Sequence, residues 1–391
     1  MVRAIAALVL LGCLGISAHG TQDPVVAVVR GTLIDGTGGE PVENAVVLIQ
    51  GQRIVAVGPA EAISVPDDAR IVDASGCAVL PGLINAHVHA AFDADQLRAW
   101  ARAGVTMVRD VGTFGSMNAD LARTFVDRDQ LNAESGGARL IATGPLVTTI
   151  GGYGGHYVSS PDDARDKINR LIDQGADVIK TAIEDNLQGR QWPMLTLEET
   201  RAIVETAHSR GIRVAAHVSQ AVHVEQALDA NVDDVNHMAV DPMPDELIAR
   251  MVAQGMQWVP TMELWDCVAV KHDAAGWLAT ALDNLRRFSG AGGQVVLGTD
   301  YAGYSCDFDA GMPMTEIRLM EQAGMTPMEI LVSATRNGAI ACGRGDELGT
   351  LEPGKLADLM IVEGDPLDDL SALLRVRTVL ISGRIIWNKP D

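Results

Sequence analysis

The stretch Val79-Leu80-Pro81-Gly82-Leu83-Ile84-Asn85-Ala86-His87-Val88-His89 joins an apolar, strand-like run to two histidines that are separated by one residue. Side chains alternate between the two faces of a strand, so both imidazoles point to the same side. Neutral imidazole is a good ligand for zinc and similar divalent metals. The stretch therefore predicts a strand whose carboxyl end presents two metal ligands.

Seven further apolar runs follow, with helix-like stretches between them. They are Val105–Asp110, Leu140–Leu146, Val178–Thr181, Val214–His217, Asp234–His237, Trp258–Thr261 and Val295–Asp300. A helix is expected over 196–210, because Glu198 and Glu199 fall in its first turn and Gly211 follows as a stop. Eight strand–helix units in about 270 residues predict an α/β protein with a (β/α)8 TIM barrel.

Both ends of the chain are rich in short β-branched runs separated by polar or glycine-rich turns. These runs are Val25–Val29, Ala45–Ile49, Ile54–Val57, Asp358–Val362, Val376–Ile381 and Ile385–Trp387. They predict a small β-sandwich domain built from residues 21–79 and 351–391, around a barrel over 80–350. A chain of 391 residues has room for one barrel of roughly 250 residues and one small domain.

The N-terminus has the pattern of a secretory signal peptide over residues 1–20. Arg3 supplies the positive charge, Ala4–Leu14 is apolar, and the small residues of Ala18-His19-Gly20 suit cleavage before Thr21. We therefore expect export to the periplasm or the medium. Lipoprotein anchoring through Cys13 is the alternative, and a retained, buried N-terminal helix is a further one. No later stretch resembles a membrane span of ~20 apolar residues.

The chain is strongly acidic, with 30 basic and 51 acidic residues and a formal net charge of −21. This balance argues against binding to nucleic acid or to anionic lipid. The apolar content of 47% excludes disordered, collagen-like and coiled-coil proteins. A small-molecule substrate is therefore the expected partner, and the sequence leaves open whether the chain forms a homo-oligomer.

Polar residues recur at the ends of the predicted strands. They are His87, His89, Lys180, His217, His237 and Asp300. The carboxyl ends of barrel strands meet at one rim, where the active sites of such barrels lie. A single histidine at a strand end would more often be structural, and Lys180 alone could be a surface or ion-paired lysine. Together, four imidazoles and a carboxylate predict a metal site.

Three segments resemble the amidohydrolase superfamily. Leu80–His89 is similar to its opening motif, Gly298-Thr299-Asp300 to its last-strand aspartate, and Leu351–Leu359 to its return into the small β domain. The resemblance covers nearly the whole chain after residue 20. Within the superfamily it is nearest to the prolidase-like and imidazolonepropionase-like branch.

The resemblance implies two divalent metal ions, with zinc as the expected metal. The implied ligands are His87, His89 and Asp300 for one ion, and His217 and His237 for the other. Lys180 would bridge the ions as a carbamate formed with carbon dioxide. A hydroxide between the metals would attack an amide carbonyl, and Asp300 would act as general base and then as general acid.

The implied activity is hydrolysis of an amide C–N bond in a dipeptide or an N-acyl amino acid. His156, in the glycine-rich loop 150–156, is expected to contact the substrate, as in prolidase-like relatives, although it could be an exposed loop histidine. Tyr301 and Tyr304 follow Asp300 and are expected to line the pocket. The remaining three histidines of the region are expected to be solvated; they are His208, His223 and His272.

Other activities remain open. A deaminase of this superfamily typically has a glutamate three residues after the fifth-strand histidine, where this chain has Gln220. The same metal centre could hydrolyse a lactone or another ester. A non-catalytic metal-binding barrel would usually have lost ligands, and none is missing here. The substrate-binding residues that dipeptidase relatives carry after His217 are absent, and Arg109 is as compatible with an ion pair as with a substrate clamp.

Four cysteines lie beyond residue 20, and none has Cys-x-x-Cys spacing. Cys267 and Cys306 each follow the end of one of two neighbouring predicted strands by six residues, so both loops are expected on one rim. An oxidising compartment would allow a disulfide between them. Two unpaired thiols are the equal alternative.

Overall fold

The computed structural model describes residues 24–112, 121–134, 136–187, 189–237 and 240–390. The predicted signal peptide and Cys13 lie outside these residues. In the described part of the chain, no helix is long and apolar enough to cross a membrane.

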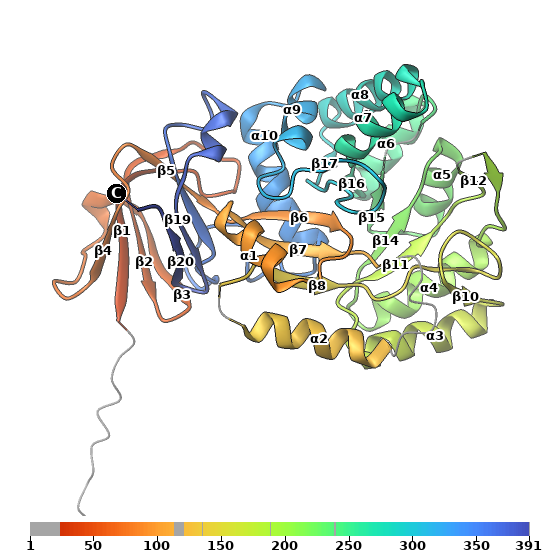
Figure 1. The fold of residues 1–391 in the computed structure, drawn as a ribbon, viewed down its shortest axis with the longest axis horizontal. Helices are drawn as coiled ribbons and strands as arrows, with labels where there is room; N and C mark the ends of the chain where they lie inside the picture. Colours follow the sequence, from red (N-terminus) through yellow and green to blue (C-terminus); the bar gives the residue numbers. More distant parts are fainter. Residues whose placement is uncertain (1–23, 113–120, 135, 188, 238–239, 391) are drawn as a thin grey trace, which may run out of the picture.

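One sheet combines the two ends of the chain (Figure 1). Its eight strands are β1 (Val25–Leu33), β2 (Val42–Gln50), β3 (Arg53–Pro59), β4 (Arg70–Asp73), β5 (Cys77–Pro81), β18 (Leu359–Glu363), β19 (Val376–Ile381) and β20 (Arg384–Asn388). The order is β20-β19-β18-β5-β1-β2-β3, with β4 paired to β1. The antiparallel pairing of β5 with β18 joins the N-terminal strands to the C-terminal ones. The η1 turn (Ala60–Ala62) and the η3 turn (Leu370–Leu374) lie in its connections.

The middle of the chain forms parallel strands. They are β6 (Leu83–Val88), β7 (Val105–Asp110), β8 (Arg139–Ala142), β9 (Val147–Thr149), β10 (His156–Val158), β11 (Ile179–Ala182), β14 (Val214–His217), β15 (Asp234–Asn236), β16 (Gln257–Val259) and β17 (Gln294–Val295). One sheet has the order β6-β7-β8 and the other β10-β9-β11-β14-β15-β16-β17. A small hairpin, β12 (Asn186–Leu187) and β13 (Arg190–Gln191), follows β11.

Helices alternate with these strands and cover their outer side (Figure 1). They are α1 (Ala94–Arg102), α2 (Leu121–Ala133), α3 (Pro161–Gln174), α4 (Leu197–Ser209), α5 (Ala221–Asp229), α6 (Asp245–Gln254), α7 (Met262–Lys271), α8 (Ala275–Gly290), α9 (Met314–Gln322), α10 (Pro327–Val332), the π-helical η2 (Ser333–Asn337) and α11 (Gly338–Ala341). The helix expected over 196–210 is confirmed as α4, which opens with a capping box between Thr196 and Glu199.

The stretch that opens the barrel region forms two strands, because it leaves one sheet and enters another. β5 ends at Pro81 and β6 begins at Leu83. A side chain on Gly82 would lie 2.2 Å from Thr106, so the crossing requires glycine. The run predicted over 140–146 is a strand only as far as Ala142 in β8, and β9 begins after it, at Val147. The last run is regular only in β17, and its continuation bonds to β6 through the Ala86 amide and the Leu297 carbonyl, 2.9 Å apart.

Candidate active site

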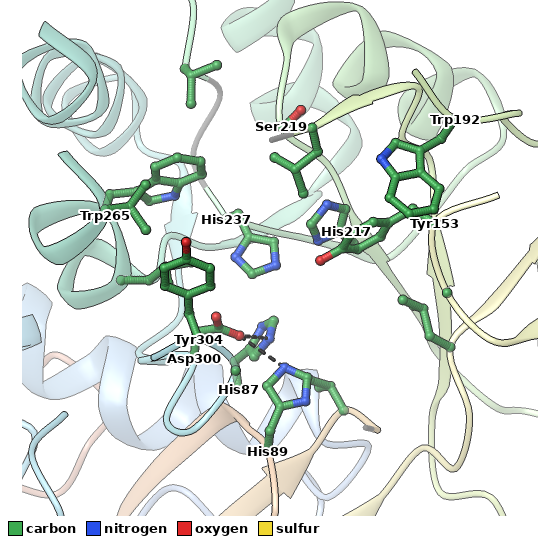
Figure 2. A pocket seen from close by; sticks show the side chains of 18 of the residues that line it. His87, His89, Tyr153, Trp192, His217, Ser219, His237, Trp265, Asp300 and Tyr304 are labelled. Atoms are coloured by element: carbon green, nitrogen blue, oxygen red, sulfur yellow. Dashed lines mark hydrogen bonds and ion pairs between the residues drawn. The ribbon is translucent and has the colours of Figure 1, made fainter. Parts of the chain in front are cut away.

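A pocket of about 770 Å³ opens at the carboxyl ends of the parallel strands (Figure 2). The six residues predicted as metal ligands all line it, and we call them the donor cluster. They are His87, His89, Lys180, His217, His237 and Asp300. Residues that are up to 213 positions apart along the chain thus converge on one place, as the barrel prediction requires.

Asp300 is held by two histidines of the opening stretch. Its Oδ1 lies 2.9 Å from Nε2 of His87 and 3.0 Å from Nε2 of His89. The Nδ1 of His89 contacts the Gly112 carbonyl, which leaves Nε2 as the nitrogen that faces the cluster. Burial opposes the carboxylate charge, but the contacts with His87 and His89 hold the pKa of Asp300 well below its usual range. Asp300 is therefore an ionised acceptor.

The backbone around Asp300 is strained, which is common at functional sites. Asp300 has φ +63° and His237 has φ +74°, both in the left-handed region that non-glycine residues rarely adopt. A side chain on Gly303 would lie 2.5 Å from both carboxylate oxygens of Asp300. The loop after β17 thus needs glycine at 303 in order to pass so close to the carboxylate.

The four imidazoles form a continuous group. Ring centroids are 5.4 Å apart for His89 and His87, 4.8 Å for His87 and His237, and 4.5 Å for His237 and His217. Burial lowers the pKa of His87 to about 3 and lowers the pKa values of His217 and His237. The Nδ1 of His237 lies 3.0 Å from the Thr261 hydroxyl, which leaves Nε2 for the pocket. These three neutral imidazoles offer the lone pairs that a metal requires. Burial disfavours the charged form of His89 as well, but its contact with Asp300 raises its pKa.

Lys180 is fully buried in β11, at the floor of the pocket. Its Nζ donates a hydrogen bond to Oδ1 of Asn236, whose amide in turn donates to Asp234 at 2.7 Å. Asp234 makes a buried two-point ion pair with Arg109, at 2.8 and 3.0 Å. Burial, helped by the charge of Arg109, lowers the pKa of Lys180 to about 7. A neutral amine at this position is the form that reacts with carbon dioxide. Arg109 is an ion-pair residue rather than a substrate clamp.

A second carboxylate lies beside His217 of the cluster, and it was not predicted from the sequence. Glu184 is buried, and its Oε2 lies 3.3 Å from Nε2 of His217. Burial opposes its charge, but the contact with His217 lowers the pKa of Glu184 to about 2. Glu184 is therefore a further ionised carboxylate at the edge of the cluster. Glu184 follows Lys180 by an even number of residues, so strand alternation would place both side chains on the same face. This spacing is the one sequence feature that could have indicated Glu184.

Three expectations need correction. Tyr301 lies outside the pocket lining: the residue after the inward Asp300 turns outward, and the Tyr301 ring packs against Trp100 at 5.1 Å. His156 begins β10, beside the lining but not in it, because strand pairing takes over where the glycine loop ends. His223 is buried, and its Nε2 lies 3.0 Å from Asp185. His272 is exposed, as expected, and it also lines the pocket. Among the expected contacts, Tyr304 does line it.

Aromatic residues from loops and helices form two walls. Figure 2 shows Tyr153 and Trp192 on one side of the histidines and Trp265 and Tyr304 on the other. We call Tyr153 and Trp192 the first wall, and Trp265, Trp277 and Tyr304 the second wall. All five line the pocket. Of these five aromatic residues, only Tyr304 was predicted from the sequence to line the pocket. No periodic pattern marks the others, because they lie on irregular loops or in the first turns of α7 and α8.

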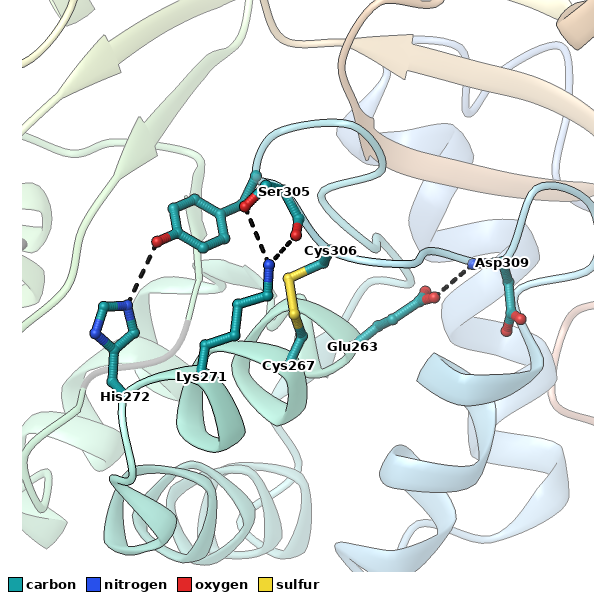
Figure 3. Close-up of a disulfide and its surroundings, with 8 residues drawn as sticks. Glu263, Cys267, Lys271, His272, Ser305, Cys306 and Asp309 are labelled. Carbon is teal, nitrogen blue, oxygen red and sulfur yellow. Dashed lines mark hydrogen bonds between the residues drawn. A yellow bond between two sulfur atoms is a disulfide. The ribbon is translucent and has the colours of Figure 1, made fainter.

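Cys267 in α7 and Cys306 in the loop after Asp300 form a disulfide, with their Cα atoms 6.1 Å apart (Figure 3). The disulfide alternative of the sequence analysis is thereby confirmed over two free thiols. Lys271 donates a hydrogen bond to the Ser305 hydroxyl at 3.0 Å beside it, and His272 lies 3.4 Å from the hydroxyl of Tyr304. α7 and the loop after Asp300 are therefore held together.

A buried set of imidazoles with a carboxylate, at the ends of parallel strands, defines a candidate metal-dependent hydrolase. The Amidohydrolase family model matches residues 78–386. The chain belongs to this family, and it is a hydrolase that acts on carbon–nitrogen bonds. The resemblance in the opening stretch is confirmed.

Curated relatives and solved structures agree with this assignment. The chain is 25% identical to ochratoxinase from Aspergillus niger, over 91% of this chain and 84% of the relative. It is 26% identical to imidazolonepropionase from Symbiobacterium thermophilum, over 83% and 86%. The structure is similar to an Xaa-Pro dipeptidase with bound methionine, with a TM-score of 0.80 and 28% identity over 92% of this chain and 99% of that one. A putative prolidase from Bifidobacterium longum gives 0.78 and 26%, over 95% and 97%.

Proposed function

We propose that the protein hydrolyses the amide C–N bond of a small molecule at two divalent metal ions, with zinc as the expected metal. The observation that carries this proposal is the donor cluster: four imidazoles, a carboxylate and a fully buried lysine converge in one pocket. His87, His89 and Asp300 would hold one ion, and His217 and His237 the other. Lys180 would bridge the ions as a carbamate, for which its low pKa supplies the neutral amine.

The donor set fits metals. In the described part of the chain, both ring nitrogens of buried His87 and the Nε2 of buried His217 lack a well-formed hydrogen bond. Buried polar atoms without partners are costly, and coordination would satisfy them. Bound divalent ions would lower the pKa of a shared water and polarise the carbonyl of the amide.

Asp300 is proposed to move the proton. Its Oδ1 already contacts both histidines of the opening stretch, so Oδ2 is the oxygen assigned to the transfer. It would accept a proton from the attacking water and deliver it to the leaving nitrogen, as general base and then acid. The low pKa of Asp300 keeps it ready to accept.

We also propose a closed (β/α)8 barrel over 80–350 and a small β-sandwich from 21–79 and 351–391. Support comes from the bonds between β6 and the continuation of β17, and from one apolar cluster that includes Ile84, Met107, Ile141, Ala215 and Val259 from five different strands. Export, proposed from residues 1–20, is supported by the disulfide, because an oxidising compartment preserves such bonds.

The proposal is tested by assaying zinc-loaded and chelator-treated protein against dipeptides, N-acyl amino acids, other amides and lactones. We expect amide hydrolysis that chelation abolishes and that zinc with bicarbonate restores. Hydrolysis of lactones alone would replace the proposal with an esterase. Release of ammonia from an aminated ring without amide cleavage would replace it with a deaminase.

A further inference from the structure

The first wall is directly attached to the donor cluster. The Tyr153 ring stacks on the imidazole of His217, with centroids 4.5 Å apart, and meets the Trp192 indole edge to face at 5.6 Å. Trp192 closes the base of the β12–β13 hairpin through a 2.7 Å bond from its amide to the Asp185 carbonyl. An aromatic face thus stands beside one side of the histidines.

The second wall lies across the pocket, on α7, α8 and the loop after Asp300 (Figure 2). Trp265 and Trp277 meet edge to face at 6.4 Å. His272 bridges Trp277 and the hydroxyl of Tyr304, and the disulfide fixes the loop that carries Tyr304 to α7. Of the chain's six tryptophans and four tyrosines, the two walls hold three and two. Such a concentration in one pocket selects flat apolar groups.

The walls carry no cation that could pair with a substrate carboxylate. Among the described lining residues Lys180 is the only Lys or Arg, and it lies at the buried floor. The sequence has no Lys or Arg at 113–120, 188 or 238–239. Two nearby cations do not line the pocket: Arg190 stacks over the Trp192 ring at 3.7 Å, and Lys271 bonds to Ser305. The net charge of −21 adds a repulsive field for anions.

We infer that the substrate is an uncharged amide with an aromatic group on each side of the scissile C–N bond. This inference rests on the proposed hydrolysis at the donor cluster and narrows its substrate class. Each wall stacks against one aromatic group, and the scissile bond lies over the cluster between them. A substrate carboxylate beside either wall would lose water without gaining a Lys or Arg partner from the described lining, which is unfavourable. The free carboxylate of a dipeptide is therefore a disadvantage here.

Four amides test this inference with the zinc-loaded wild-type protein at pH 8. N-benzyl-2-naphthamide carries both aromatic groups and no charge. N-(2-naphthoyl)phenylglycine adds one carboxylate to it, N-benzylacetamide lacks the acyl-side ring, and N-methyl-2-naphthamide lacks the amine-side ring. We expect kcat/KM for the first amide to exceed that for each of the other three by at least 10-fold. Equal or higher values for the phenylglycine compound would overturn the uncharged class.

Single-wall variants separate the two sides. Trp192→Ala should remove the advantage conferred by one of the two rings and leave the other, and Trp265→Ala should do the reverse. Trp387→Ala, in β20 and outside the pocket, is the matched control and should change neither. If both variants lose the same ring preference, or if neither loses any, the two-sided arrangement is wrong.

A measurement of substrate binding without turnover tests this inference independently of the proposed function. Quenching of tryptophan fluorescence by the four amides is measured on the Asp300→Asn protein, which needs no turnover. Weaker binding of the phenylglycine and single-ring amides supports the inference even where hydrolysis fails. Hydrolysis of carboxylated dipeptides together with no preference in binding would sustain the proposed function and overturn the inference.

Discussion

The donor cluster and the two aromatic walls face the same pocket but come from different parts of the fold. The cluster residues lie in strands or directly after them, and they are almost wholly buried: His87 is 1% exposed. The wall residues lie in loops, a hairpin and the helices α7 and α8, and Trp277 is 37% exposed. The strands fix the positions of the donor cluster, whereas the positions of the two walls depend on the connections between strands.

This difference suits the two regions to different tasks: the donor cluster to the chemical reaction and the aromatic walls to substrate recognition. Strand ends in a barrel hold their side chains in a geometry that the backbone pairing determines, so they suit chemistry. Loops vary in length and sequence at little cost to the fold, so they suit recognition. In the proposed function the cluster carries out amide hydrolysis, and in the further inference the walls determine which amide is hydrolysed.

The largest effect is expected at Asp300. Asp300→Asn should lower kcat by up to ~10⁴-fold, because Asn cannot accept and return the proton. The fold should persist, which circular dichroism and the melting temperature check. The matched control is Asp307→Asn, an exposed carboxylate on the same loop, which should keep wild-type kcat. A kcat within 10-fold of wild type for Asp300→Asn would remove the proton relay from the account.

Lys180→Ala should lose at least one metal ion and lower kcat/KM by more than ~100-fold, since even outer partners of metal ligands are worth that much. Short carboxylic acids should restore part of both, because they can replace the carbamate oxygens. Elemental analysis with and without propionate measures the effect. Two ions per chain in the variant without any added acid would refute the bridge.

The contact between α7, which carries Trp265 of the second wall, and α9 should respond to pH. Glu316 in α9 accepts a hydrogen bond from the Glu263 amide in α7 at 2.8 Å. Burial raises the pKa of Glu316 to about 8 and that of Glu263 to about 7. Both pKa values lie above the ordinary value of 4.5, so the folded protein holds protons that the unfolded chain releases. The stabilisation from these protonated carboxyls is therefore fully present below pH 4.5 and is lost as pH rises through 7 and 8.

Glu316→Gln should therefore become more stable relative to wild type as pH rises from 5 to 8.5, by on the order of a few kcal/mol. Melting temperatures of both proteins across this range measure it, and the comparison at each pH cancels effects common to both. Glu321→Gln, exposed on the same helix, is the control. A difference between Glu316→Gln and wild type that stays constant with pH would show that Glu316 does not titrate as described.

The smallest effect is expected from the disulfide. Cys306→Ser should lower the free energy of unfolding by ~2–4 kcal/mol, because the bond closes a loop of 39 residues. The phosphine reductant TCEP should lower the melting temperature of wild type to that of the variant and leave the variant unchanged. Equal melting temperatures for untreated wild type and variant would show that the bond does not stabilise the second wall.

Sequence reasoning reached the donor cluster because strand parity and strand-end spacing are local properties. His87 and His89 share a face, and Lys180, His217 and Asp300 each end an apolar run. It failed where the decisive contact is tertiary. Burial of His223 depends on Glu184 and Asp185 from another connection, and Tyr301 turned outward because its neighbour points inward.

The walls could not be predicted for the same reason. Trp192 and Trp265 lie 73 positions apart, and nothing local shows that they face one pocket. The glycine-rich loop 150–156 was correctly placed at the rim, but the residue that lines the pocket there is Tyr153 rather than His156. Loop conformation, not composition, decided which side chain points inward.

The most direct test of the central claim is the number of metal ions that the wild-type chain binds. Protein reconstituted with zinc and bicarbonate, freed of excess metal by gel filtration, is measured by elemental analysis against protein concentration. The donor cluster predicts two ions per chain, and amide hydrolysis that rises in step with them. Fewer than one ion per chain, or hydrolysis independent of the ions bound, would contradict it.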